Sequence, residues 1–184
     1  MSAPTIETPR LLLRPWRASD YDAWAALSAD ARVMEFFAGT IERERALADA
    51  AKIAERLTEN GYGWWVVEVK GGAPYVGHVA LQDVPFAAHF TPALEVGWRL
   101  AAEFWGNGYA TEGARAALAF AFQTLHRSEV IAMTAKINVR SQRVMQRLGM
   151  AYDPGDDFDN PRVADGSPLR PHVLFRIARD GAER

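Results

Sequence analysis

The sequence contains no cysteine among its 184 residues. Disulfide bonds, thiolate metal sites and a covalent cysteine nucleophile are therefore excluded. It also has no uninterrupted apolar run that approaches a membrane span, and its first residues, MSAPTIETPR, lack the basic-then-apolar order of a signal peptide. From these absences we expect a cytoplasmic protein that does not enter a membrane.

An excess of charge of one sign is also missing. Lys and Arg number 21 against 23 Asp and Glu, which gives a net charge of −2 and argues against a dedicated nucleic-acid binder. Hydrophobic residues make up 49% of the chain, a globular composition. The length suits one domain with a sizeable core, which we expect to span residues 1–184.

One stretch organises the rest of the chain. Residues 94–100, LEVGWRL, alternate between apolar and other side chains, which predicts a half-buried strand. The glycine-containing segment WGNGYAT follows at 105–111, and small or apolar residues then recur at helical spacing up to Ala121. The sequence therefore predicts a strand, a glycine turn and the N-terminus of a helix, in that order.

This turn has the features of a phosphate-binding site. A helix start leaves its first N–H groups unpaired and carries a partial positive charge, and Gly106 and Gly108 have no Cβ to keep a ligand from the backbone. The alternative is that the two glycines only shape a tight turn. The P-loop string is absent, and Thr111 stands where a dinucleotide fingerprint has its third glycine. A nucleotide-phosphate binder therefore remains a minor hypothesis.

Periodicity and turn residues predict the other elements. We expect strands at 10–14, 64–70, 75–82, 129–135 and 172–177, and helices at 21–29, 40–58, 110–125 and 138–148, with a short helical piece at 32–37. Ser19-Asp20 and Thr40 are the expected N-caps of the first two long helices. Antiparallel hairpins around a single strand–helix–strand crossover predict an α/β fold with a mixed sheet and helices on both faces.

The six residues Trp105–Ala110 resemble motif A of the GNAT acetyltransferases, R/Q-x-x-G-x-G/A, with tryptophan in place of Arg or Gln. The string EVGWRL followed by WGNGYATE is similar to the RimJ/RimL-like (ribosomal-protein N-acetyltransferase-like) branch, where this tryptophan is familiar. The element order also matches, so the resemblance covers nearly the whole chain. It implies a mostly antiparallel sheet with a splayed central strand pair, acetyl-CoA as co-substrate, no metal, and an amine acceptor that is a protein N-terminus or a small molecule.

The resemblance also implies which residues hold acetyl-CoA. Gly97 lies mid-strand, where a bulge would admit the pantetheine arm, unless it is only a packing glycine. Asn138 would cap a helix and reach the amide or thioester region of the co-substrate. The arm would contact the backbone of Trp98, Arg99 and Leu100, and the pyrophosphate would contact the amides of Gly106, Asn107, Gly108, Tyr109, Ala110 and Thr111.

Two residues are the expected catalytic groups. By the resemblance Glu95 is the base that deprotonates the amine through water, and Ser141 protonates the departing thiolate. The alternatives are a carboxylate paired with Arg99 or another cation, and a first-turn polar residue. A non-catalytic acyl-CoA-binding or sensor module on the same fold would need neither residue, and their presence favours an enzyme.

The acceptor side is less specific in the sequence. Its expected walls include Trp16, Phe37, Trp64, His78 and Gln82, although each residue is also compatible with a core position. Asp156, Asp157 and Asp159 are spaced as in a solvated loop, not as in a metal site. The C-terminal segment resembles a GNAT subgroup that tends to have histidine where Asn160 and Ser167 stand, so the acceptor of this chain is expected to differ if those histidines bind it. Aromatic content and an extended C-terminal segment are compatible with a homodimer without specifying one.

Overall fold

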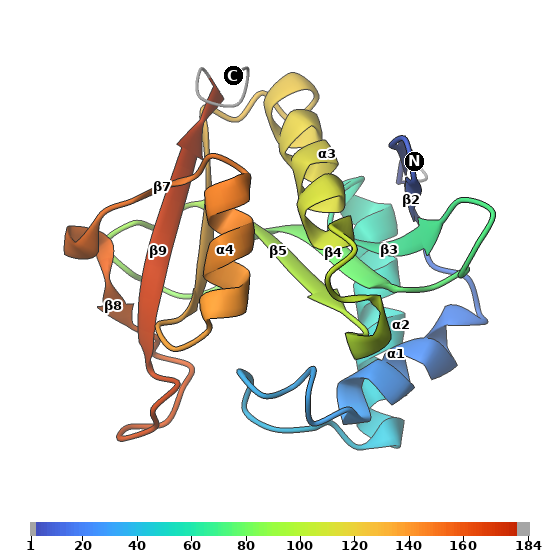
Figure 1. Ribbon diagram of the computed structural model, residues 1–184, viewed down its shortest axis with the longest axis horizontal. Coiled ribbons are helices and arrows are strands. Elements are labelled where there is room, and N and C mark those ends of the chain that lie inside the picture. The colour runs from blue at the N-terminus through green and yellow to red at the C-terminus, as the bar shows by residue number, and fades with distance from the viewer. Residues whose placement is uncertain (1–2, 180–184) are drawn as a thin grey trace.

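The computed structural model describes residues 3–179 (Figure 1). The ends of the expected 1–184 domain, residues 1–2 and 180–184, lie outside the described residues. The elements follow in the order β1 (Ile6–Glu7), β2 (Leu11–Arg14), α1 (Asp20–Ala29), α2 (Arg43–Asn60), β3 (Trp64–Val69), β4 (Gly77–Asp83), β5 (Leu94–Leu100), η1 (Ala102–Phe104), α3 (Tyr109–Gln123), β6 (Glu129–Ala135), α4 (Val139–Arg147), β7 (Ala151–Tyr152), η2 (Pro154–Asp156), β8 (Phe158–Asp159) and β9 (Pro171–Ala178).

The strands form one nine-stranded sheet in the order β1-β2-β3-β4-β5-β6-β9-β7, with β8 paired to β9. Every pairing is antiparallel except that of β5 with β6, which α3 connects as a crossover. A parallel pair needs such a crossover, whereas the antiparallel pairs need only turns or loops. The predicted mixed, mostly antiparallel sheet is confirmed.

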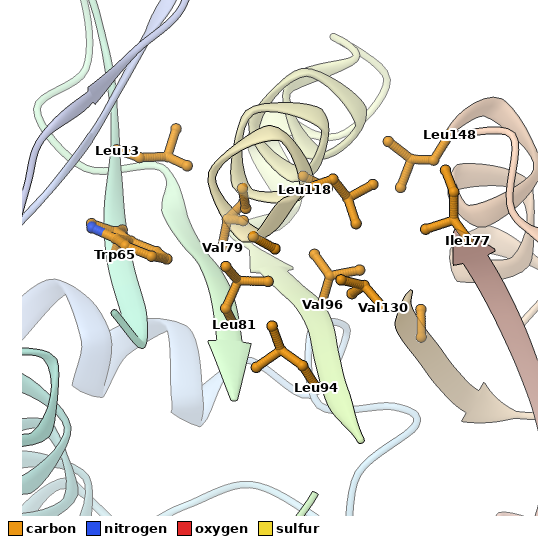
Figure 2. Close-up of a cluster of buried hydrophobic side chains, with 14 of the residues drawn as sticks. Leu13, Trp65, Val79, Leu81, Leu94, Val96, Leu118, Val130, Leu148 and Ile177 are labelled. Carbon is orange, nitrogen blue, oxygen red and sulfur yellow. The ribbon is translucent and has the colours of Figure 1, made fainter. Parts of the chain in front are cut away.

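Helices cover both faces of this sheet, as predicted. The larger core lies beneath α3 and α4, and Figure 2 shows Leu118 of α3 above Val96 of β5, with Leu148 and Ile177 at one end of the same cluster. On the opposite face a smaller cluster joins Trp24 of α1 to α2. None of the helices formed by residues 3–179 is long and apolar enough to cross a membrane.

The parallel pair β5–β6 separates soon after it forms. The two seven-residue strands share only the pair Glu95–Ile131. Residues 94–96 on β5 and 130–132 on β6 are buried, whereas 97–99 on β5 and 133–134 on β6 are partly exposed. Figure 1 shows β5 turning away from β9 and α4. The sheet therefore opens in its middle, at the carboxyl ends of its two parallel strands.

Two local predictions are wrong and a third holds only in position. Ser19 occupies the N-cap position of α1, but its side chain makes no capping hydrogen bond, and the Asp20 carboxylate accepts the Arg17 N–H at 2.6 Å. Helix α2 begins at Arg43 after Glu42, not after Thr40. Residues 32–37 form successive turns and no helix. There Asp30 accepts the Arg32 N–H at 2.9 Å, a local side-chain bond that competes with helical pairing.

A buried ion-pair network fixes α1 against the sheet. The Arg14 guanidinium donates to both oxygens of Asp20, at 2.7 and 2.9 Å, and to Glu68 at 2.6 Å. It also donates to two backbone carbonyls, and the Arg14 and Asp20 side chains are only 4% and 3% exposed. Trp24 lies four residues after Asp20 on the same helix and is buried in the cluster on this face.

Candidate active site

The residue at the last pair before the sheet opens is Glu95. Its carboxylate is 8% exposed and accepts a hydrogen bond from Gln82 Nε2 at 2.9 Å, because the two residues face each other between β4 and β5. Gln82 in turn accepts from Trp64 Nε1 at 2.9 Å. Burial raises the pKa of Glu95 to about 7, although the Gln82 hydrogen bond and the charge of Arg162 oppose the rise. A carboxylate tuned in this way suits proton transfer near neutral pH.

Gly97 keeps space open on the same face of β5. Side chains alternate along a strand, so Glu95, position 97 and Arg99 point away from the core beneath α3. A Cβ added to Gly97 would meet no atom within 4 Å. The packing-glycine alternative is therefore wrong, and an open space lies between the Glu95 and Arg99 side chains. The expected bulge is also wrong, because β5 pairs with β4 residue for residue through Gly97.

The glycine turn at 105–111 is open. The Trp105 N–H donates to the Ala102 carbonyl at 3.2 Å, whereas the N–H groups of 106–111 have no backbone partner among residues 3–179. Gly106 and Gly108 have φ values of +80° and +79°, the left-handed conformation that favours glycine. The first helical bond of α3 runs from the Glu112 N–H to the Gly108 carbonyl at 3.0 Å, which leaves the N–H groups of residues 109–111 without a helical partner. A Cβ at Gly106 would meet nothing within 4 Å. The turn can therefore receive a phosphate group.

The sequence analysis missed Arg10 beside this turn. Its guanidinium donates to the Asn107 carbonyl at 3.1 Å and to Glu112 at 2.6 Å, and it lies 5.0 Å from the centre of the Tyr109 ring. Burial opposes a low pKa for Glu112, but hydrogen bonds from Thr8 and Arg10 lower the pKa overall. Arg10 thus braces the turn and adds positive charge. Local periodicity cannot reveal a contact between residues so far apart in the chain.

The opposite side of the opening is the start of α4. Asn138 Oδ1 accepts the Ser141 N–H at 3.2 Å, which confirms the predicted N-cap. Asn138 Nδ2 donates to Thr134 Oγ1 at 2.9 Å and to Ser141 Oγ at 3.1 Å. Thr134 lies in the part of β6 that has left β5, so this cluster of three polar side chains borders the opening.

Of the expected acceptor walls, Phe37, Trp64 and Gln82 lie around the open face. The Phe37 ring is 4.1 Å from Arg99 Cζ. Trp64 donates a hydrogen bond to Gln82, which donates one to Glu95. Trp16 and His78 instead stack on each other, 4.6 Å apart.

His78 is fully buried, and its Nε2 lies 2.6 Å from the Tyr75 hydroxyl. Burial, with the charges of Arg99 and Arg14, holds its pKa well below 6.5 and keeps the ring neutral. His78 therefore supports the aromatic cluster and has no exposed surface of its own.

Asn160 and Ser167 of the C-terminal segment make contacts within that segment. Asn160 Nδ2 lies 3.2 Å from His172 Nε2, and Ser167 Oγ accepts the Leu169 N–H at 3.2 Å. Within residues 3–179, no three His, Asp or Glu side chains are grouped so that they could hold a metal ion. Arg162, which the sequence analysis did not mark, is close enough for its charge to act on Glu95.

The sequence model described as "Acetyltransferase (GNAT) domain" matches residues 10–151, well over half of the chain. The chain belongs to the GNAT acetyltransferase family. The protein is thus an acyltransferase, and GNAT acetyltransferases use acetyl-CoA.

Similar proteins agree with this family. The enzyme named FsC-acetyl coenzyme A-N(2)-transacetylase from Aspergillus fumigatus is 33% identical over 156 residues, which cover 81% of this chain and 66% of that protein. The structure of a GNAT-family acetyltransferase from Bacillus anthracis has a TM-score of 0.80 at 25% identity, covering 96% and 99% of the two chains. Mycobacterium smegmatis RimJ, solved with CoA-disulfide, has a TM-score of 0.78 at 19% identity, covering 100% and 93%. RimJ therefore shares the fold of this chain.

The residues of this GNAT protein fit such a co-substrate. Free amides and an open glycine turn suit the pyrophosphate, and the separated strands leave the backbone of Trp98, Arg99 and Leu100 without β6 as a partner. The Asn138–Ser141 cluster stands across the opening. The groups expected to hold the co-substrate therefore lie on the two diverging strands and at the starts of the helices that follow them.

Proposed function

We propose that the protein transfers an acetyl group from acetyl-CoA to a primary amine by direct attack in a ternary complex. The observation that carries this proposal is the nearly buried Glu95 carboxylate at the last β5–β6 pair, beside the open space at Gly97. A cysteine intermediate is excluded because the chain has no cysteine.

The proposed co-substrate site spans the opening. The amides of residues 106–111 bind the pyrophosphate at the start of α3, where the helix dipole adds favourable charge. The backbone of residues 98–100 pairs with the pantetheine arm much as an added strand would. Asn138 faces the amide or thioester region. A fold-level neighbour, RimJ, was solved with a CoA derivative, which supports this part of the proposal.

Two residues transfer protons during the proposed acyl-transfer reaction. An α-amine has a pKa near 8 and a lysine amine one near 10.4, so most acceptors must lose a proton before they attack. Glu95 takes that proton through water. A new N–C bond then forms and the C–S bond breaks. The Ser141 hydroxyl, held by Asn138, gives a proton to the departing thiolate and receives through water the second proton that the attacking nitrogen loses. A backbone N–H near Trp98 stabilises the oxyanion.

The acceptor class is an amine. The name of the fungal relative places its acetyl transfer on N(2), a nitrogen, which favours an amine acceptor here. A protein N-terminus and a small-molecule amine both fit that description. The rival, a non-catalytic acyl-CoA-binding module, would give no reason for the raised pKa of Glu95.

The pH profile of turnover tests the role of Glu95. Protonated Glu95 cannot accept a proton, so kcat/KM for amine-dependent thiol release should fall about tenfold per pH unit below a pKa of about 7 and level off above it. An alkyl amine with a pKa near 10.4 is the acceptor, because it stays protonated throughout this range, needs the base, and adds no ionisation of its own to the profile. A profile that is flat from pH 5.5 to 8.5 would remove Glu95 from the mechanism.

A further inference from the structure

Arg99 lies on the same face of β5 as Glu95, with the open space at Gly97 between them. Its guanidinium is enclosed by three rings, with Cζ 4.1 Å from the centre of Phe37, 5.1 Å from Trp24 and 5.8 Å from Trp64. These rings come from the α1–α2 loop, from α1 and from β3. Three separate elements therefore position one arginine head group over the open face.

The donors of this guanidinium are unused. Nε and Nη1 are buried and have no hydrogen-bond partner, and none of the ion pairs within residues 3–179 includes Arg99. Arg14, the other strongly enclosed arginine of this half, donates to two carboxylates and two carbonyls. Arg99 has no such partners although its Nε and Nη1 are buried.

Aromatic faces do not replace those partners. A cation–π contact acts on the face of a ring and leaves the in-plane N–H groups of the guanidinium free. A buried charged donor without an acceptor costs more than a neutral one, and burial lowers the pKa of Arg99 only to about 10, so the group stays charged at neutral pH. The fold therefore holds a positive charge at the open face without an anion of its own.

We infer that Arg99 binds a carboxylate of the acceptor, so the acceptor is a small molecule or chain end that carries both an amine and a carboxylate. A planar carboxylate matches the planar guanidinium fork and can accept two parallel N–H bonds from it. Arg99 and Glu95 are four residues apart, about 13 Å along the strand, and their side chains can converge on a molecule that lies over Gly97. This inference rests on the proposed function, because it specifies the acceptor of the same site.

Matched acceptors test the inference. Amines are compared in pairs that differ only in a free carboxylate or the corresponding carboxamide, and the acid-to-amide ratio of kcat/KM is measured for each enzyme variant. Wild type should prefer the acid by about 10- to 100-fold, the range expected for hydrogen bonds to a charged partner. The acid and the amide also differ in amine basicity, but this difference affects wild type and Arg99→Met equally. After correction for it, the acid-to-amide ratio of Arg99→Met should be about one.

Two further variants keep the test independent of folding. Arg99→Lys keeps the charge without the planar fork and should lower the ratio by a smaller factor. Arg140→Met is the matched control, because Arg140 also lies near two rings, Phe36 and Trp105, but is exposed and paired with Glu35. Its acid-to-amide ratio should equal that of wild type.

The outcomes separate this inference from the proposed function. Amine acetylation with equal ratios in wild type and Arg99→Met would overturn the inference and leave the function standing. If no amine is acetylated, the proposed function fails, and tryptophan fluorescence decides the inference, since Trp24 and Trp64 flank Arg99. A saturable change in wild-type fluorescence on adding the carboxylates, absent in Arg99→Met, would support the inference. No fluorescence change in wild type would overturn the inference.

Discussion

Glu95→Gln is expected to lower kcat/KM for amine acetylation by about 100- to 10,000-fold, the usual contribution of a positioned general base. The substitution keeps the size of the side chain and its contact with Gln82, so the binding of acetyl-CoA should not change. Thiol release with a fixed amine measures turnover, and a thermal shift with acetyl-CoA measures binding.

The same variant should be more stable than wild type at high pH. The pKa of Glu95 rises from 4.5 to about 7 on folding, so ionised Glu95 destabilises the fold by about 3 kcal/mol above pH 7. Stability is therefore lost as pH rises from about 4.5 to 7 in wild type, and glutamine, which never ionises, avoids that loss. The gain should shrink towards zero near pH 4.5.

Glu129→Gln is the matched control for both measurements. Glu129 also lies on a sheet strand, but its side chain is 44% exposed and pairs with Arg176 at the surface. Its loss should change stability by less than about 1 kcal/mol and leave turnover unchanged. Equal turnover in Glu95→Gln and wild type would contradict the mechanism, whatever the stability result.

Arg14→Met should cost about 3–5 kcal/mol of unfolding free energy, because it leaves the Asp20 carboxylate buried without its cation. The Asp20 side chain is 3% exposed and would keep only the Arg17 N–H, at 2.6 Å. Methionine replaces the apolar stem of Arg14, so the loss reports the charge and not a cavity. Urea unfolding at pH 7 measures it.

Arg17→Met is the control for this network. Arg17 also pairs with Glu68, at 3.0 Å, but its side chain is 57% exposed. An exposed pair contributes about 0–1 kcal/mol, so this variant should unfold close to wild type. If the two variants lose the same free energy, burial of the Arg14 network is not what stabilises the attachment of α1.

Much of the fold could be predicted because its central elements have strong patterns. The alternation at 94–100 and the β-branched run at 129–135 gave both strands with the bounds that the structure has. The segment 32–37 misled because its apolar residues are spaced as in a helix. In the structure the rings of this loop contact arginines of β5 and α4, an arrangement that sequence spacing does not show.

The site was predictable where it depends on local backbone and not where it depends on distant side chains. Gly106, Gly108 and the Asn138 cap follow from short segments, and the structure has them as expected. The bracing of the turn by Arg10 and the ring of aromatic side chains around Arg99 join residues from separate elements. The position of Arg99 in the sequence predicted a role for its backbone, and gave no sign that its side chain would be enclosed by aromatic rings.

The central claim is that the turn at 105–111 and the opening beside it bind acetyl-CoA, and a thermal shift tests it most directly. Acetyl-CoA at 100 times its Kd should stabilise the protein by about 2.7 kcal/mol, and ATP or NAD should not match it. Gly106→Asp places a carboxylate in the turn and should abolish most of the shift. Gly106→Asn, which has the same shape without the charge and tolerates the positive φ of this position, should keep more of it.

The predicted result is therefore a large shift in wild type, a smaller one in Gly106→Asn and almost none in Gly106→Asp. The absence of any shift at saturating acetyl-CoA, or equal shifts in the three proteins, would contradict the account.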